Sequence, residues 1–221
     1  MLKTIKILIQ KEITLELRQK TALYSMILYV VSTVYLCYLS FKLKTNDLNP
    51  ITWNTIFWII TLFSAVNTIS KSFTQERQER MLYYYTIANP VSIILSKTIY
   101  NALLMVVLTM GGFLFYILVM GNPVQDVWLY FISVVLGALG FAATLTLVAG
   151  IAAKANNSAT LMAVLSFPVV IPMLVMVLKI SKNAMDGLDR SLSYKEIATM
   201  LSVDAIIIVL SVILFPFLWR S

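Results

Sequence analysis

Long apolar runs and short polar segments alternate along the chain. A helix needs about 20 apolar residues to cross the roughly 30 Å hydrocarbon core of a bilayer, and six runs approach or exceed that length. We therefore predict six transmembrane helices. They cover residues 22–41, 51–70, 93–120, 127–153, 160–179 and 203–219.

The runs are continuous and lack the short alternating segments of membrane β-strands, which predicts an all-α membrane protein. Composition agrees, because 60% of the residues are hydrophobic, 12% are charged and the mean hydropathy is +0.87. No internal repeat or low-complexity linker divides the sequence. We treat residues 1–221 as a single transmembrane domain.

The first twenty residues predict a helix lying at the membrane surface. Ile5, Ile9, Ile13 and Leu17 recur at helical spacing, and basic residues occupy the other side, as suits an anionic inner leaflet. A cleavable targeting sequence does not fit, because this stretch contains two glutamates and no continuous apolar centre. A basic flank that only orients the first span is the alternative.

Residues 71–90, KSFTQERQERMLYYYTIANP, form a charged segment between the second and third apolar runs. Written as a helix, the segment carries aromatic residues and Met81 on one side and charges on the other, with Glu76 and Arg80 at the favourable i, i+4 spacing. We predict a cytoplasmic coupling helix bound by an ATPase. A solvated loop anchored at the headgroups by its tyrosines is the alternative. The predicted coupling residues are Phe73, Glu76, Arg77, Glu79 and Arg80.

The distribution of lysine and arginine predicts that both termini lie in the cytoplasm. With that orientation, 11 of the 17 basic residues fall in inner segments and 6 in outer ones. This bias accounts for the net charge of +7 without a nucleic-acid partner.

Several residue types that carry chemistry are scarce. The chain has no histidine and a single cysteine, Cys37, so histidine catalysis and a cysteine-rich metal site are excluded. No G-x-x-x-x-G-K-[ST] motif is present, so ATP is expected to bind another chain. Asp204 is the only candidate for an ionisable residue deep in a span, and we expect an exposed acid near the outer start of the last helix.

Two patterns concern helix packing. Pro168 and Pro172 stand one turn apart in the fifth run, which predicts a kink that, if it faced the bundle interior, would border a substrate path. Ser193 and Glu196 form a predicted capping box at the start of the last helix. Small residues at steps of four, three and four predict a face for close helix packing in the fourth run, made of Ser133, Gly137, Gly140 and Thr144.

The six runs, together with four local features, resemble the CcmB family over almost the whole length. These features are Phe73-x-x-Glu76, the downstream Lys97, Phe167-Pro168-x-x-x-Pro172 and Phe215-Pro216-Phe217. Around residues 80–90 the chain departs from the family pattern, since Arg80, Tyr83 and a single Pro90 replace a Gly-Leu-Glu stretch and a proline-rich turn.

The resemblance implies a multi-pass, six-helix ABC-2-type permease subunit of the bacterial inner membrane that acts in cytochrome c maturation, also described as haem export. It implies three partners besides the lipid bilayer: an ABC ATPase subunit, a haem-handling membrane subunit and a periplasmic haem chaperone. Haem iron is most often held by histidine, which this chain lacks. We expect Met110, Met120, Met173 and Met176 to serve packing, and no cofactor to be bound by this chain itself.

Two other functions fit the residues. An ABC-2-type exporter of a lipid, drug or polysaccharide precursor would share the six spans and the coupling helix. A non-transporting membrane assembly factor would need no ATPase contact at Glu76–Arg80. The sequence leaves open whether two copies of this chain pair or a different membrane subunit supplies the second half.

Overall fold

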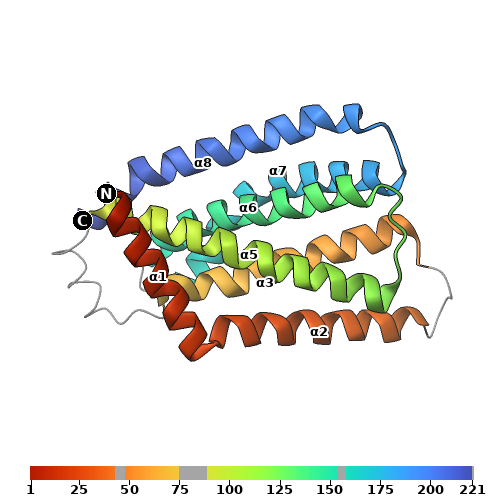
Figure 1. The fold of residues 1–221 in the computed structure, drawn as a ribbon, viewed down its shortest axis with the longest axis horizontal. Helices are drawn as coiled ribbons and strands as arrows, with labels where there is room; N and C mark the ends of the chain where they lie inside the picture. Colours follow the sequence, from red (N-terminus) through yellow and green to blue (C-terminus); the bar gives the residue numbers. More distant parts are fainter. Residues whose placement is uncertain (43–47, 75–88, 154–157, 221) are drawn as a thin grey trace.

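The computed structural model describes residues 1–42, 48–74, 89–153 and 158–220, and every regular element in these ranges is helical. Long helices run alongside one another, and both termini lie at the same end of the bundle (Figure 1). The elements are α1 (Leu2–Gln19), α2 (Thr21–Lys42), α3 (Pro50–Thr74), α5 (Pro90–Met120), α6 (Val127–Ala152), α7 (Ser158–Met185), the 3-10 turn η1 (Arg190–Ser193) and α8 (Tyr194–Arg220).

Five helices in the described ranges are long and apolar enough to cross a membrane. α3 is not among them, although the second predicted span lies within it, because hydroxyl and amide side chains such as Thr61 and Asn67 are spread along its length. The predicted count of six is therefore not confirmed. The five candidate spans are Leu23–Phe41, Pro90–Met120, Val127–Ala152, Thr160–Met185 and Arg190–Phe217.

The turn between α5 and α6 follows from local signals. Gly121 ends α5 with φ +80, a conformation that favours glycine. Asp126 then caps α6, because its side chain accepts a hydrogen bond from the Leu129 amide at 3.1 Å. At its other end α5 begins with Pro90. The preceding residue, Asn89, caps the helix, because its side chain accepts a hydrogen bond from the Val91 amide.

α6 is the central helix of the bundle. In its most apolar window 72% of the residues are buried, against 17–29% in the other four candidate spans. It packs against α3, α5, α7 and α8. Many of its buried positions are small, including Gly137, Ala138, Gly140, Ala142 and Ala143, which lets four neighbours approach one helix closely.

The last helix begins where the Ser193–Glu196 pattern predicts, before the predicted apolar span. α8 begins at Tyr194, directly after Ser193, and continues through residue 203, where the predicted span started. The Ser193 hydroxyl accepts a hydrogen bond from Asn183 Nδ2 of α7 at 3.0 Å, so it ties the start of α8 to the preceding helix. α7 in turn runs without interruption through both of its prolines.

Candidate functional site

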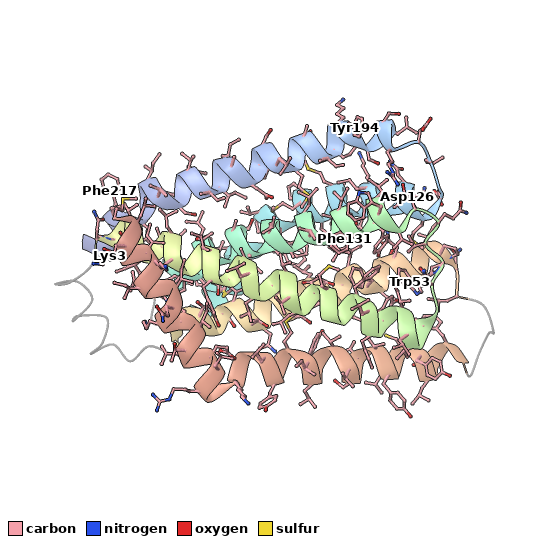
Figure 2. All side chains as sticks on the ribbon, in the orientation of Figure 1. Lys3, Trp53, Asp126, Phe131, Tyr194 and Phe217 are labelled. Carbon is pink, nitrogen blue, oxygen red and sulfur yellow. The ribbon has the colours of Figure 1, made fainter. Side chains whose placement is uncertain are left out.

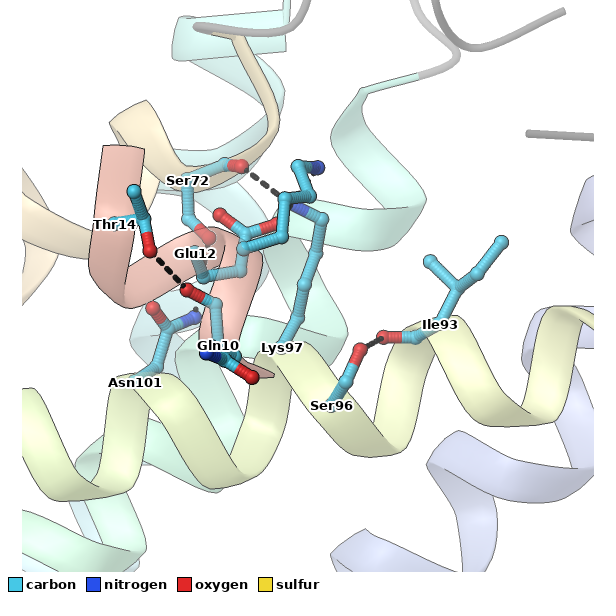
Figure 3. Close-up of polar contacts among 9 residues, drawn as sticks. Gln10, Glu12, Thr14, Ser72, Ile93, Ser96, Lys97 and Asn101 are labelled. Atoms are coloured by element: carbon cyan, nitrogen blue, oxygen red, sulfur yellow. Dashed lines mark hydrogen bonds and ion pairs between the residues drawn. The ribbon is translucent and has the colours of Figure 1, made fainter. Parts of the chain in front are cut away.

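A buried lysine lies at the end of the bundle where the termini meet. Lys97, in the second turn of α5, is only 2% exposed. Its ammonium group forms an ion pair with Glu12 of α1 at 3.2 Å and donates a hydrogen bond to the Ser72 carbonyl of α3 at 2.8 Å (Figure 3). A buried cation is tolerated only when it is paired in this way. We call Glu12, Ser72, Phe73, Lys97 and Asn101 the Lys97 site.

The Lys97 site lies at the C-terminal end of α3. The last four carbonyls of a helix have no partner within it, and the helix dipole places partial negative charge there. Lys97 donates to the Ser72 carbonyl from a neighbouring helix, two residues before Thr74, the last described residue of α3. Its ammonium also lies 4.9 Å from the centre of the Phe73 ring, a cation–π distance.

Phe73 connects the site to α6 and α8. The ring is 2% exposed and its centre lies 6.3 Å from that of Phe215. Both rings approach Gly150 of α6, where an added Cβ would stand 3.2 Å from Phe215 and 3.5 Å from Phe73. Glycine at this position therefore lets the two aromatic rings lie against the backbone of the central helix.

Asn101, one turn after Lys97, links three helices. Its amide donates to the Thr146 hydroxyl of α6 at 2.9 Å and to the Ser72 hydroxyl of α3 at 3.4 Å. The amide is 1% exposed, so these bonds satisfy a group that would otherwise be buried without a partner. The Lys97 site thus joins α1, α3, α5, α6 and α8 at the point where the chain leaves α3.

α1 is held by both of its acidic residues. Glu12 accepts from Lys97 and also from Lys11, at 3.2 Å in each case. Glu16 is 8% exposed and accepts from the Leu23 amide of α2 at 3.0 Å. Between α1 and α2 the chain turns at Lys20, which has φ 53. The first helix is therefore fixed to α5 by charge and to α2 by a hydrogen bond.

Of the five predicted coupling residues, the structure describes only the one at the end of α3. Phe73 lies in the Lys97 site, whereas Glu76, Arg77, Glu79 and Arg80 lie outside the described residues. Lys97 had entered the prediction only through the family resemblance. Sequence reasoning missed Glu12, its ion-pair partner, although a lysine among apolar residues requires a nearby carboxylate and the surrounding segments contain few. It also missed Asn101, which bonds to Ser72 in the same site.

The small-residue face of α6 is buried throughout. Ser133 donates to the Tyr130 carbonyl at 2.7 Å, and an added Cβ at Gly137 would stand 2.5 Å from the Trp58 ring of α3. Gly140 faces Met173 and Asp204, and the Thr144 hydroxyl lies 3.0 Å from the Met173 sulfur. These positions receive side chains from α3, α7 and α8.

Asp204 differs from its prediction. It is 8% exposed, and its Oδ1 atom has no hydrogen-bond partner. Because α8 begins at Tyr194, Asp204 stands in the third turn, on the same side as Met200 and Ile207, and packs against Gly140 of α6. The expectation of an exposed acid near the outer start of the last helix is therefore wrong. Lys97 and Asp204 are both buried ionisable residues within candidate spans.

The two prolines do not border an internal path in this chain. Pro168 and Pro172 are both exposed, as are the neighbouring Phe167, Val169 and Ile171. They lie on the outer surface of α7, whereas Val170 and Met173 face the core. The predicted kink therefore does not face the bundle interior.

Cofactor ligands are sparse in the described residues, where no three His, Cys, Asp or Glu side chains are grouped to hold a metal ion. Met173 is fully buried and accepts from Thr144. A groove of about 430 Å³ between α2 and α5 is lined by apolar side chains and glycines, among which Met26 carries the one soft donor atom. The groove offers apolar contact rather than a set of metal ligands.

Comparison with known protein families decides the assignment. The model of the CcmB protein family matches residues 3–219, essentially the whole chain. The chain belongs to the CcmB family. Membership makes it a membrane permease subunit of the haem-export and cytochrome c maturation type rather than an enzyme. A search of curated proteins finds no match.

Proposed function

We propose that this CcmB protein is the membrane subunit through which an ATPase drives one step of bacterial cytochrome c maturation. The match over residues 3–219 is the observation that carries this proposal. In the proposed arrangement α3 supplies a sixth crossing beside the five candidate spans, and the end that carries both termini faces the cytoplasm. The basic residues of the inner segments support that orientation.

The ATPase would contact residues 71–90, which join α3 to α5. The Lys97 site then offers a route for movement into the bundle, because Ser72 and Phe73 belong both to that segment and to the Lys97 site. A shift of this end of α3 changes the partners of Lys97 in α5 and of Phe215 in α8. Glu12 extends the same connection to α1.

A buried ion pair suits this task. Its geometry is restricted, since a charge that loses its partner in a low-dielectric interior carries a penalty of several kcal/mol. Small displacements of α3 would therefore not be absorbed by gradual loosening of the site. They would favour a second arrangement in which Lys97 keeps a partner, and α1 and α5 would move together with α3.

Haem would be held by a neighbouring protein. The chain has no histidine, and the sulfur of the buried Met173 already accepts a hydrogen bond from Thr144. In our proposal a haem-handling membrane subunit supplies the ligands, and a periplasmic haem chaperone leaves the complex after ATP turnover. Stoichiometric haem on the isolated chain that is lost on substitution of its methionines would contradict this part.

Deletion of the gene, complemented by the tagged chain, tests the function. We expect the deletion strain to lack c-type cytochromes on haem staining, and the wild-type chain to restore them and to co-purify with an ATPase subunit. Normal cytochromes in the deletion strain would overturn the proposal. Lys97→Met should fail to restore staining while the ATPase still co-purifies, because the substituted residue lies behind the proposed contact segment.

A further inference from the structure

α1 exposes a basic face that contains no acid. Lys3, Lys6, Arg18 and Lys20 are all exposed, whereas Glu12 and Glu16 face the bundle, where they accept from Lys97 and from the Leu23 amide. The sequence of α1 mixes both signs of charge, but the fold separates them. Only positive charge remains toward the surroundings.

An apolar flank accompanies these cations. Leu2 is 83% exposed, Ile13 40% and Leu17 60%. At 100° per residue these three positions fall within one narrow arc of the helix, with Lys6 in the middle of the arc and Lys3 beside it. The predicted stripe is thus divided, because Ile5 is 8% exposed and packs against the bundle while Ile13 and Leu17 do not.

The position of α1 places this face at a membrane surface. Figure 1 shows α1 crossing obliquely over one end of the bundle instead of running along it. The left-handed turn at Lys20 then directs the chain into α2, whose residues Leu23–Phe41 form a candidate span. A helix joined in this way to a membrane-crossing helix lies near the headgroups of one leaflet.

We propose that the exposed face of α1 binds anionic phospholipid. Leu2, Ile13 and Leu17 would enter the region between headgroups and acyl chains, and Lys3 and Lys6 would contact lipid phosphates. Lysine suits this position because its long apolar stem can cover acyl chains while the ammonium stays at the headgroups. Each cation near an anionic surface strengthens such binding roughly fivefold.

The bound state of α1 would support the Lys97 site. The bundle side of the helix carries Glu12, so a helix fixed in the leaflet holds this carboxylate at a constant depth beside Lys97. This inference goes beyond the proposed role in cytochrome maturation. Its test measures lipid contact directly and does not depend on that role.

The experiment uses the full chain in lipid nanodiscs. An environment-sensitive fluorophore is attached at Leu17→Cys in a Cys37→Ser background, and brominated lipids serve as quenchers. We expect blue-shifted emission and strong quenching with a 7:3 mixture of phosphatidylcholine and phosphatidylglycerol, and several-fold weaker quenching with phosphatidylcholine alone. Added salt should reduce the difference.

Matched variants separate charge at this face from charge in general. Lys3→Gln with Lys6→Gln should remove most of the response to phosphatidylglycerol, whereas Lys179→Gln with Lys182→Gln, exposed cations of α7, should leave it unchanged. Equal quenching in both lipids would overturn the proposal. A response that appears only after addition of the ATPase subunit would also overturn it, since the face would then bind protein.

Discussion

The two ends of the bundle are built from different interactions. Lys3 and Phe217 mark one end, and Trp53 and Asp126 mark the other (Figure 2). The first end contains the Lys97 site, where a buried ion pair connects helices. The second contains packed aromatic rings joined by neutral hydrogen bonds.

The aromatic end gathers residues from α3, α5 and α6. Trp53 and Tyr116 have ring centres 4.6 Å apart, and Phe113 stacks on Tyr130 at 5.0 Å. Tyr116 donates to the Trp53 carbonyl and Tyr130 to Asn54 Oδ1, each at 2.9 Å. Ser181 of α7 accepts from both Asn54 and Trp58. Here every tyrosine hydroxyl within the cluster has a partner, and no charged group takes part in these contacts.

This difference assigns separate tasks to the two ends. Closely packed rings whose tyrosine hydroxyls are hydrogen-bonded resist displacement, which suits a fixed point for helix movement. At the C-terminal end of α3, the buried ion pair of Glu12 and Lys97 connects helices through a few charged and polar atoms. These atoms can exchange one hydrogen-bond partner for another. We therefore expect substitutions at the Lys97 site to affect function beyond their effect on stability, and substitutions at the aromatic end to affect stability alone.

The largest expected effect follows from breaking the ion pair. Glu12→Gln replaces a carboxylate that pairs with the buried Lys97 by a neutral amide, and we expect the free energy of unfolding to fall by up to about 3–5 kcal/mol. Thermal unfolding of the purified chain in detergent measures the loss. Glu12→Asp keeps the charge and serves as control. A loss below about 1 kcal/mol in the Gln variant would show that the pair does not hold the folded chain together.

Glycine substitutions give the next largest effect and compare a crowded position with an open one. An added Cβ at Gly140 meets Met173 and Asp204, whereas at Gly111 nothing lies within 4 Å. We expect Gly140→Ala to destabilise by about 1–3 kcal/mol through overpacking. Gly111→Ala should stabilise by up to about 1 kcal/mol, since alanine favours helix. Equal shifts in the unfolding temperature of the two variants would contradict the central packing of α6.

At the aromatic end, Tyr116→Phe removes one hydroxyl and retains the ring. We expect a loss of about 1 kcal/mol, because the hydrogen bond to the Trp53 carbonyl is lost while packing is kept. Cytochrome maturation should stay at the wild-type level. If haem staining fell as strongly as in a Lys97 variant of similar stability, the proposed separation between the two ends would be wrong.

The smallest effect concerns pH. The hydrogen bonds from Arg190, 2.6 and 3.0 Å long, and from the Leu129 amide hold the pKa of Asp126 below its ordinary value of 3.8. A lowered folded-state pKa gives stability that is present above 3.8 and is lost as pH falls through the folded value. The drop in unfolding temperature from pH 6 to pH 3 should therefore be smaller in Arg190→Gln. An unchanged drop would show that solvent screens this exposed pair completely.

Much of the fold follows from the hydrophobic pattern. The apolar runs predict the long helices, because backbone groups in lipid must be satisfied within each segment. The second predicted span, in α3, is not among the five candidate spans, since α3 carries polar side chains whose internal bonds, such as Asn54 with Ser181, a hydropathy profile cannot include. The Ser193–Glu196 pattern predicts the start of α8, whereas η1 and the hydrogen bond from Asn183 to Ser193 depend on the tertiary fold.

The site was predicted only in part. The family resemblance named Phe73 and Lys97, but their contact depends on α3 and α5 being neighbours, which spacing along the chain does not reveal. The outward position of Pro168 and Pro172 and the burial of Asp204 depend on helix rotation. A shift of one residue turns a helix by about 100°, so a face is predicted reliably only where a long periodic pattern determines it.

A double variant tests the central claim most directly. Replacing both charges together, as Glu12→Leu with Lys97→Met, removes the ion pair without leaving a buried charge, and such replacements are often neutral or stabilising. We predict a stable chain that still co-purifies with an active ATPase subunit but fails to restore haem-stained c-type cytochromes in the deletion strain. Full restoration of these cytochromes by the double variant would contradict the claim that movement enters the bundle through Lys97.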